Sequence, residues 1–228
     1  MLKIGIVGAG RIGKVHTQSI CNYVRNAKIK TIADPFMSEE TAKWAKSLGV
    51  QNTTKDYKEI LNDPEIGAVL ICSSTDTHAK ISVEAINAGK HVFCEKPIDH
   101  DVARIQEVIA ALKGKNLKYQ VGFNRRFDHN FEAVHEAVKS GKIGSPEIIK
   151  ITSRDPEPPS PEYVKVSGGM FLDMTIHDFD MARFLVDSDV EEVYVQSAVL
   201  VDPAIGEAGD VDTAIITMKM ANGDEEAK

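Results

Sequence analysis

Two side chains in the last third of the chain have the types and spacing of a general base with its orienting carboxylate. Asp173 and His177 stand four residues apart in a stretch with a helical pattern, so their side chains share one face of the predicted helix. A carboxylate beside an imidazole fixes the ring orientation and favours the protonated form, which makes His177 a competent base near neutral pH. On these residues alone, a structural Asp–His hydrogen bond that anchors the helix is the simpler interpretation.

A lysine near the middle of the chain is a second candidate for chemistry. Residues 94–97, Cys-Glu-Lys-Pro, end a predicted strand, which would place Lys96 at the carboxyl edge of a sheet. An ammonium group there can bind a substrate hydroxyl and lower its pKa. From position alone, an ordinary surface lysine explains the residue equally well.

A glycine turn near the N-terminus has the spacing of a dinucleotide-binding loop. Gly8, Gly10 and Gly13, with Arg11 and Ile12 between them, follow an apolar run and open a helical pattern. Gly8 would permit the tight turn, Gly10 would let a pyrophosphate approach the backbone, and Gly13 would let helix and strand pack closely. The N–H groups of the helix N-terminus would then face the phosphates.

Asp34 ends the second predicted strand, where an acid accepts hydrogen bonds from the adenosine ribose hydroxyls and repels a 2′-phosphate. No arginine follows it in the sequence Pro35-Phe36, so we expect NAD rather than NADP. The alternative is a plain turn residue before Pro35.

A polar loop, Ser73-Ser74-Thr75-Asp76-Thr77-His78, leaves another predicted strand and caps a helix, with Thr75 or Asp76 as the expected N-cap. It belongs at the carboxyl edge of the sheet, where ligands bind in such folds, although capping alone would also explain it. We expect structural or surface roles for His16, His91, His100, His129 and His135. No histidine pairs with a second ligand at typical metal spacing, so no metal site is predicted.

The elements around these residues alternate over residues 1–122. Continuous apolar runs predict strands covered on both faces at Lys3–Val7, Lys28–Ala33, Ala68–Cys72, His91–Cys94 and Lys118–Val121. Amphipathic stretches between them predict helices at 12–24, Ser38–Leu48, Lys55–Leu61, Thr77–Ala88 and Val102–Leu112. This order predicts a doubly wound parallel sheet of the Rossmann type.

Residues 123–228 change in character and predict an α+β domain with a mostly antiparallel sheet. Helices are expected over Asp128–Ser140 and Phe171–Val186, and strands over Glu147–Ser153, Val190–Leu200 and Asp212–Met220. Four prolines forbid helix within 155–161. Asn222-Gly223 is a hairpin signal that requires a further strand, so the sheet is expected to be incomplete.

Composition excludes several classes of partner. The net charge of −7 disfavours nucleic acid and anionic membrane surfaces, which need clustered lysine and arginine. No apolar run approaches the ~20 residues that span a bilayer, and Met1 leads directly into a strand, so no signal peptide is expected. Cys72 and Cys94 lie in apolar runs and are expected to be buried. These features predict a cytoplasmic protein.

Together, the motifs resemble the Gfo/Idh/MocA oxidoreductases over nearly the whole chain. The motifs are VGAGRIG at 7–13, SSTDTH at 73–78, Glu-Lys-Pro at 95–97, GFNRRFD at 122–128 and GGMFLDMTIHDFDMARF at 168–184. Ser153-Arg-Asp-Pro156 with its proline-rich continuation resembles the inositol dehydrogenase branch. The resemblance implies a Rossmann domain and an α/β domain whose sheet forms oligomers, with tetramers expected among full-length relatives. Family members run roughly a hundred residues longer, so the chain is expected to lack further strands.

The resemblance also implies roles for individual residues. Lys96, Asp173 and His177 match the catalytic residues, which favours the functional interpretation of the Asp–His pair. Thr75, His78 and Glu95 match positions that line the cofactor, and Arg125 and Asp155 fall in segments that line the polyol pocket. The implied reaction is NAD-dependent oxidation of a cyclic polyol, with myo-inositol giving the 2-keto product. The alternatives are another sugar or inositol isomer as substrate, and an inactive NAD-binding protein.

Overall fold

The computed structural model describes residues 1–224, which form two compact units, one ending at Gly122 and the other beginning at Phe123. The predicted fold class is confirmed: a parallel Rossmann sheet with helices on both faces is followed by a unit with a separate antiparallel sheet.

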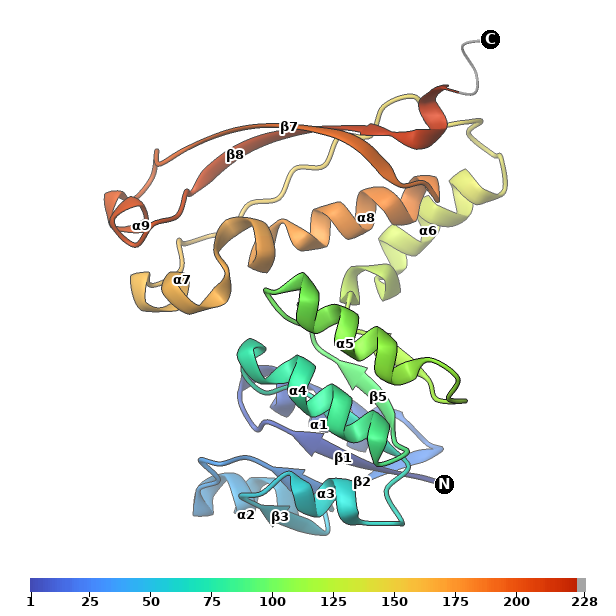
Figure 1. The fold of residues 1–228 in the computed structure, drawn as a ribbon, viewed down its shortest axis with the longest axis vertical. Coiled ribbons are helices and arrows are strands. Elements are labelled where there is room, and N and C mark those ends of the chain that lie inside the picture. Colours follow the sequence, from blue (N-terminus) through green and yellow to red (C-terminus); the bar gives the residue numbers. More distant parts are fainter. Residues whose placement is uncertain (225–228) are drawn as a thin grey trace. The chain divides into compact units, whose positions relative to one another are not determined.

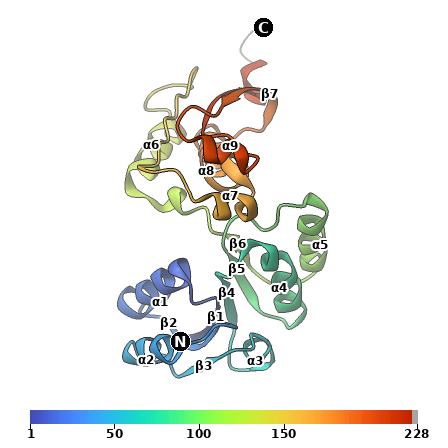
Figure 2. The ribbon, with the colours of Figure 1, turned by 90° about the vertical axis from the view of Figure 1, so that its left-hand side faces the viewer.

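The first unit is built on one six-stranded parallel sheet with the order β3-β2-β1-β4-β5-β6 (Figure 1 and Figure 2). The strands are β1 (Leu2–Val7), β2 (Ala27–Ala33), β3 (Asn52–Thr54), β4 (Ala68–Ile71), β5 (His91–Cys94) and β6 (Tyr119–Val121). Five of these were predicted within two residues at each end. The order reverses between β1 and β4, and ligands bind at such a switch point in open parallel sheets.

Helices cover both faces of this sheet. Figure 2 shows α1 and α2 on one face and α4 and α5 on the other. Their bounds are α1 (Arg11–Tyr23), α2 (Glu39–Ser47), α3 (Lys58–Asn62), α4 (Thr75–Asn87) and α5 (Val102–Leu112). Ser38 and Asp101 cap α2 and α5, because their side chains accept hydrogen bonds from Thr41 N and Ala103 N.

Burial of the apolar strands against these helices forms the core. Ile6, Val69 and Ile71 are fully buried, and the helices add Ala85 and Ile86. Each of the valine and isoleucine side chains contributes roughly 1.5–3 kcal/mol on burial. Cys72 and Cys94 are buried as predicted, while Cys21 is exposed.

The second unit joins helices to a two-stranded antiparallel sheet, β7–β8 (Figure 1). Its elements are η1 (Asn124–Phe127), α6 (His129–Lys139), α7 (Pro161–Ser167), the π-helical turn η2 (Met170–Met174), α8 (Ile176–Val186), β7 (Val190–Ala198), α9 (Pro203–Glu207), β8 (Thr213–Met220) and η3 (Ala221–Asp224). The strand predicted beyond Asn222-Gly223 lies outside the described residues.

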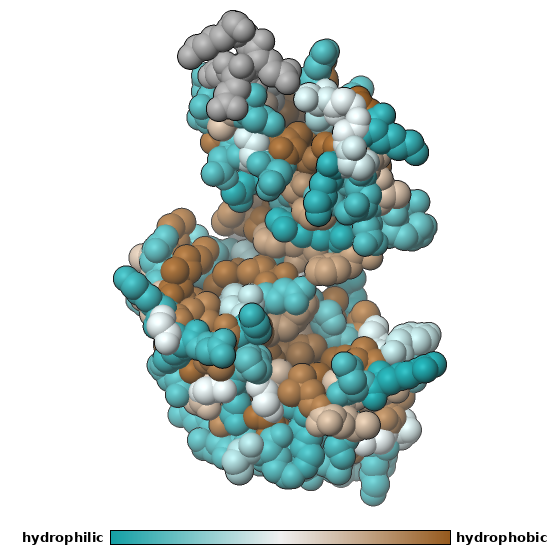
Figure 3. Space-filling model, turned by 90° about the vertical axis from the view of Figure 1, so that its right-hand side faces the viewer, coloured by the Kyte–Doolittle hydropathy of each residue, from teal (hydrophilic) through white to brown (hydrophobic). Residues whose placement is uncertain are grey.

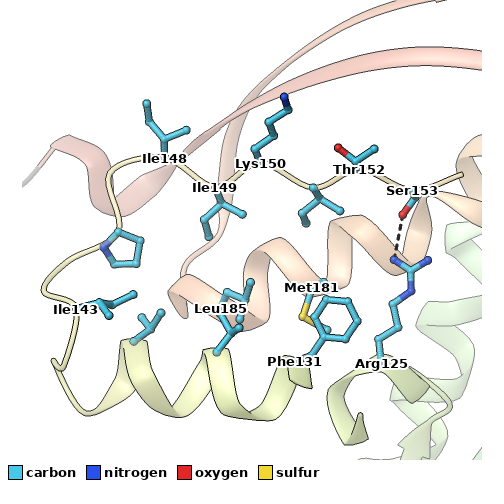
Figure 4. Close-up of a pocket in the computed structure, with 14 residues that line it drawn as sticks. Arg125, Phe131, Ile143, Ile148, Ile149, Lys150, Thr152, Ser153, Met181 and Leu185 are labelled. Carbon is cyan, nitrogen blue, oxygen red and sulfur yellow. Dashed lines mark hydrogen bonds between the residues drawn. The ribbon is translucent and has the colours of Figure 1, made fainter. Parts of the chain in front are cut away.

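Two predicted elements of this unit are wrong. Glu147–Ser153 is not a strand: Figure 4 shows Ile148, Lys150 and Thr152 on one side and Ile149 on the other, but the segment joins no ladder with the residues that the structure describes. The helix predicted over Phe171–Val186 is interrupted, because Thr175 N binds Met170 O at 2.9 Å in a wider turn.

The segment that follows α6 borders an apolar groove of about 590 Å³ (Figure 4). Its walls come from α6, α8 and the extended segment, with Phe131, Met181, Leu185 and Ile149 among them. The lining is mainly aliphatic, and Arg125, Lys150, Thr152 and Ser153 are its polar members.

The surface mixes polar and apolar side chains, and apolar ones reach it in both units (Figure 3). Within residues 1–224, no helix combines the length and the apolar character needed to cross a bilayer.

Candidate functional site

Four parallel strands end together at the edge of the first unit's sheet. Their last residues, Ala33, Val7, Ile71 and Cys94, are paired in register across the sheet. The glycine turn, Asp34, the polar loop and the Glu95-Lys96 segment follow these residues directly. The structure therefore brings the predicted cofactor-binding segments of this unit to one edge.

The glycine turn has the geometry that close approach of a ligand requires. Gly8 has a φ of +100°, and a Cβ there would lie 2.5 Å from the backbone oxygen of Cys72. A Cβ on Gly13 would lie 2.1 Å from Gly8 O, so this glycine lets α1 pack against the turn. A Cβ on Gly10 would meet nothing within 4 Å. The space over Gly10 is open, as binding of a dinucleotide requires.

The N-terminus of α1 provides the complementary charge. Gly10 is its N-cap, Arg11 and Ile12 are the first helical residues, and no side chain among the described residues caps it. First-turn N–H groups and the helix dipole favour an anion at such a position. The turn and helix therefore fit the pyrophosphate of a dinucleotide.

Asp34 binds the glycine turn as well as its own loop. Its Oδ2 accepts a hydrogen bond from Ala9 N at 2.6 Å, and its Oδ1 accepts one from Phe36 N at 2.8 Å. A carboxylate has about four lone-pair sites, so both oxygens can still accept from ribose hydroxyls. Asp34 therefore stabilises the turns around it and also lies where a carboxylate that binds the adenosine ribose is expected.

The polar loop starts its helix earlier than predicted. α4 begins at Thr75 with Ser74 at the N-cap, so the expected cap at Thr75 or Asp76 is wrong. The loop is held instead by a contact of 2.6 Å between the hydroxyls of Ser73 and Thr77.

His78, on α4, is buried and braces the polar loop. Its Nδ1 lies 2.8 Å from Pro97 O and its Nε2 lies 3.0 Å from Ser73 O. The side chain thereby ties the polar loop to the Glu-Lys-Pro segment. Its contact with the cofactor stays a prediction.

The Glu95-Lys96 segment is joined to α1 by a contact that the sequence analysis did not identify. His16 Nε2 lies 2.7 Å from Glu95 Oε1, and the His16 ring packs edge-on against Phe93. Lys96 is half-buried and is followed by a cis peptide bond to Pro97. His16 lies one helical turn after Gly13, and this spacing was the available signal for a side chain at the sheet edge.

In the second unit, Asp173 lies in η2 and His177 in the first turn of α8, and both are half-buried. Single π-turns within helices occur frequently at functional sites. The Tyr163 hydroxyl donates a hydrogen bond to Asp173 Oδ2 at 2.9 Å. Tyr163 was not predicted, because a contact across ten residues and two elements leaves no periodic signal in the sequence.

The two residues predicted to line the polyol pocket have different surroundings. Arg125 forms an ion pair with Asp178 and donates to Ser153 Oγ at 3.3 Å. Asp178 also accepts from Ser153 Oγ at 2.6 Å. Asp155 is exposed in the irregular segment before α7. Their roles as substrate ligands stay predictions.

The neighbouring arginine also binds α8. Arg126 makes a bidentate pair with Asp180, with Nε–Oδ2 at 2.8 Å and Nη2–Oδ1 at 2.6 Å. The Asp180 side chain is only 8% exposed, so its charge depends on this partner. Ion pairs thus join the GFNRRFD motif to the helix that carries His177.

Arg126→Ala is expected to lower the free energy of unfolding by about 2 kcal/mol, since it strands a buried carboxylate. Urea denaturation measures the loss. Arg183→Ala is the matched control: its pair with Asp189 is exposed on both sides, so its effect should stay under about 1 kcal/mol. Equal effects of the two changes would contradict a structural role for the Arg126–Asp180 pair.

Within the described part of the chain, no group of three or more His, Cys, Asp or Glu side chains is arranged to hold a metal ion.

Comparison with known proteins places the chain in a family. An oxidoreductase family described by its NAD-binding Rossmann fold matches residues 2–123, and the Gfo/Idh/MocA C-terminal domain matches residues 131–224. The uncharacterized oxidoreductase YrbE of Bacillus subtilis is 49% identical over 96% of this chain. The myo-inositol 2-dehydrogenase of Thermotoga maritima is 45% identical over 97% of it. This chain spans 64% and 66% of the length of these two relatives.

A solved structure gives the same result. The scyllo-inositol dehydrogenase of Lactobacillus casei, crystallised with NAD(H) and scyllo-inositol, superposes with a TM-score of 0.88 at 34% identity. The match covers 98% of this chain and 67% of that one. With both family domains matched in order, the chain belongs to the Gfo/Idh/MocA family of oxidoreductases.

Proposed function

We propose that this protein oxidises a secondary ring alcohol of a cyclic polyol with NAD, and that it converts myo-inositol to 2-keto-myo-inositol (scyllo-inosose). The observation that carries the proposal is the sheet edge where the open space over Gly10, the Asp34 carboxylate and Lys96 follow strands paired in register. The named activities of the inositol dehydrogenase relatives supply the substrate class.

The proposed cofactor contacts follow the geometry of the first unit. Gly8, Gly10 and Gly13 with the N-terminus of α1 would hold the pyrophosphate, and Asp34 the adenosine ribose. Residues of the two following loops complete the predicted set: Ser73, Ser74, Thr75, His78, Glu95 and Lys96. When bound, NAD supplies the hydride acceptor at nicotinamide C4.

The proposed chemistry assigns one task to each catalytic residue. Lys96 binds the reacting hydroxyl and stabilises the negative charge that develops on its oxygen. His177 removes the hydroxyl proton, and Asp173 orients the imidazole and stabilises its charge. Arg125 and Asp155 contact other hydroxyls of the polyol. The cytoplasmic location and the oligomeric state stay predictions from the sequence.

Asp34→Asn is expected to weaken the preference for NAD over NADP. The amide keeps an acceptor oxygen but removes the charge that repels a 2′-phosphate. We expect the Kd for NAD to rise by ~10-fold, because a hydrogen bond to a charged acceptor is worth about 1.5 kcal/mol or more. The Kd for NADP should fall, because the charge that repels its 2′-phosphate is removed. Calorimetric titration of both cofactors measures this. An unchanged Kd for NADP would remove Asp34 from the specificity role.

A substrate panel tests the proposed reaction. Incubation with NAD and myo-inositol, scyllo-inositol or glucose, followed by NADH absorbance, should show the fastest turnover with myo-inositol. Lys96→Ala should abolish most of that turnover. Faster turnover of another polyol would change the substrate assignment. Saturable NAD binding without turnover of any polyol would favour the alternative, a non-catalytic NAD-binding protein.

A further inference from the structure

Tyr163 contacts the proposed catalytic segment from outside it. The residue lies in α7, and its hydroxyl donates to Asp173 Oδ2 at 2.9 Å. A carboxylate that accepts one hydrogen bond at Oδ2 has lone pairs left on both oxygens for a second donor. The contact therefore restrains Asp173 without preventing it from binding an imidazole.

The donor itself is fixed at its backbone. Ser160 caps α7, and its Oγ accepts a hydrogen bond from Tyr163 N at 3.3 Å. Pro161 occupies the first turn of α7, where its fixed φ suits the helix. Val164 is buried and holds the helix against the unit. The backbone of Tyr163 is thus held in a short helix that is capped and packed against its unit.

The acceptor segment is held at its first residue. Met170 N, at the start of η2, donates to Asp210 Oδ2 at 2.8 Å, and the turn closes with Thr175 N on Met170 O at 2.9 Å. These contacts fix the backbone that carries Asp173 and leave its side-chain torsions to be set by other partners. A hydroxyl at hydrogen-bond distance from one carboxylate oxygen is such a restraint.

We propose that Tyr163 is a positioning residue that holds the Asp173 carboxylate in the orientation from which it directs His177. The inference rests on the proposed function, which gives Asp173 and His177 their roles. Tyr163 acts through Asp173: it needs no contact with substrate or cofactor, and its hydroxyl rather than its ring carries the effect.

Tyr163→Phe removes the hydroxyl and keeps the ring in place. We expect kcat for the polyol to fall by about 10-fold, because small displacements of catalytic groups have effects of this size or larger. The KM for the polyol and the Kd for NAD should stay within about twofold of the wild type. Tyr194→Phe, an exposed tyrosine on β7, is the matched control and should change nothing.

A double-mutant cycle separates positioning from a general structural role. If Tyr163 acts through Asp173, Tyr163→Phe should lower kcat in the wild type but have little further effect in an Asp173→Asn background. Additive losses in the two backgrounds would overturn the proposal. An unchanged kcat in Tyr163→Phe, while His177→Ala remains impaired, would overturn it as well and leave the proposed function intact.

A spectroscopic measurement tests the inference without turnover. In protein labelled at histidine, the His177 imidazole resonances are assigned from the peaks that His177→Gln removes. Tyr163→Phe should shift these resonances, because the orienting carboxylate has changed. Unshifted His177 resonances would overturn the inference whatever the activity of the chain, whereas shifted resonances without turnover would count against the proposed function alone.

Discussion

His177→Ala is expected to lower kcat at neutral pH by ~10²–10⁴, the range for loss of a general base. The side chain lies in the first turn of α8, four residues after Asp173, and the proposal makes it the acceptor of the hydroxyl proton. The proton must leave as the carbinol hydride leaves, so the loss falls on the transition state and hence on kcat. Steady-state kinetics with saturating NAD and polyol measures it.

His129→Ala is the matched control for that experiment. His129 is exposed at the start of α6 in the same unit and has no proposed role in the reaction. Its replacement should leave kcat unchanged. A wild-type kcat in His177→Ala would remove this residue from the base role, and equal losses in both variants would show a general effect of the substitutions.

Alanine substitutions at Gly10 and Gly13 should distinguish an effect on NAD affinity from an effect on the stability of the fold. Gly10→Ala adds a methyl group where nothing lies within 4 Å, so the fold is expected to keep its stability while NAD affinity drops by at least ~10-fold. Gly13→Ala places its methyl 2.1 Å from Gly8 O, which forces α1 away from the turn. We expect this variant to lose about 1–3 kcal/mol of stability as well as NAD affinity.

Calorimetric titration measures the NAD affinity of each variant, and urea denaturation measures the free energy of unfolding of each. The pair is informative because the two changes are chemically identical and lie three residues apart on the same turn. Wild-type NAD affinity in Gly10→Ala would mean that the open space over this residue is not where the dinucleotide binds.

The sequence predicts most of the first unit because its strands are continuous apolar runs buried on both faces. β3 was not predicted for the opposite reason: Asn52-Thr53-Thr54 is short and polar, and among the described residues the strand pairs with β2 alone, at the edge of the sheet. Its existence depends on a neighbour and not on its own pattern.

In the second unit, the residue pattern predicts which side chains share a face of a segment, but it does not predict whether a neighbouring strand pairs with that segment. The side chains of Ile148 and Ile149 alternate as in a strand (Figure 4), yet a strand also requires a ladder, and the segment has none among the described residues. The interruption near Thr175 arises in a similar way. No proline marks it, and the tether from Asp210 to Met170 joins residues forty positions apart.

The same distinction applies to the candidate site, where some residues follow from local sequence and others only from tertiary contacts. Residue types and strand–turn–helix context single out Gly8 and Asp34 as candidates, whereas Lys96 is favoured over an ordinary surface lysine only by the family resemblance. The contacts that hold the site come from tertiary structure, as His16–Glu95 and Tyr163–Asp173 show. No spacing rule connects such partners.

Transfer of the carbinol hydrogen from polyol to NAD tests the central claim most directly. The chain is incubated with NAD and myo-inositol carrying deuterium at the carbinol carbon of position 2, and the reduced nicotinamide is analysed by mass spectrometry. We predict one deuterium per NADH formed and a loss of this product in Lys96→Ala and His177→Ala. Unlabelled NADH, or NAD that binds and is never reduced, would contradict it.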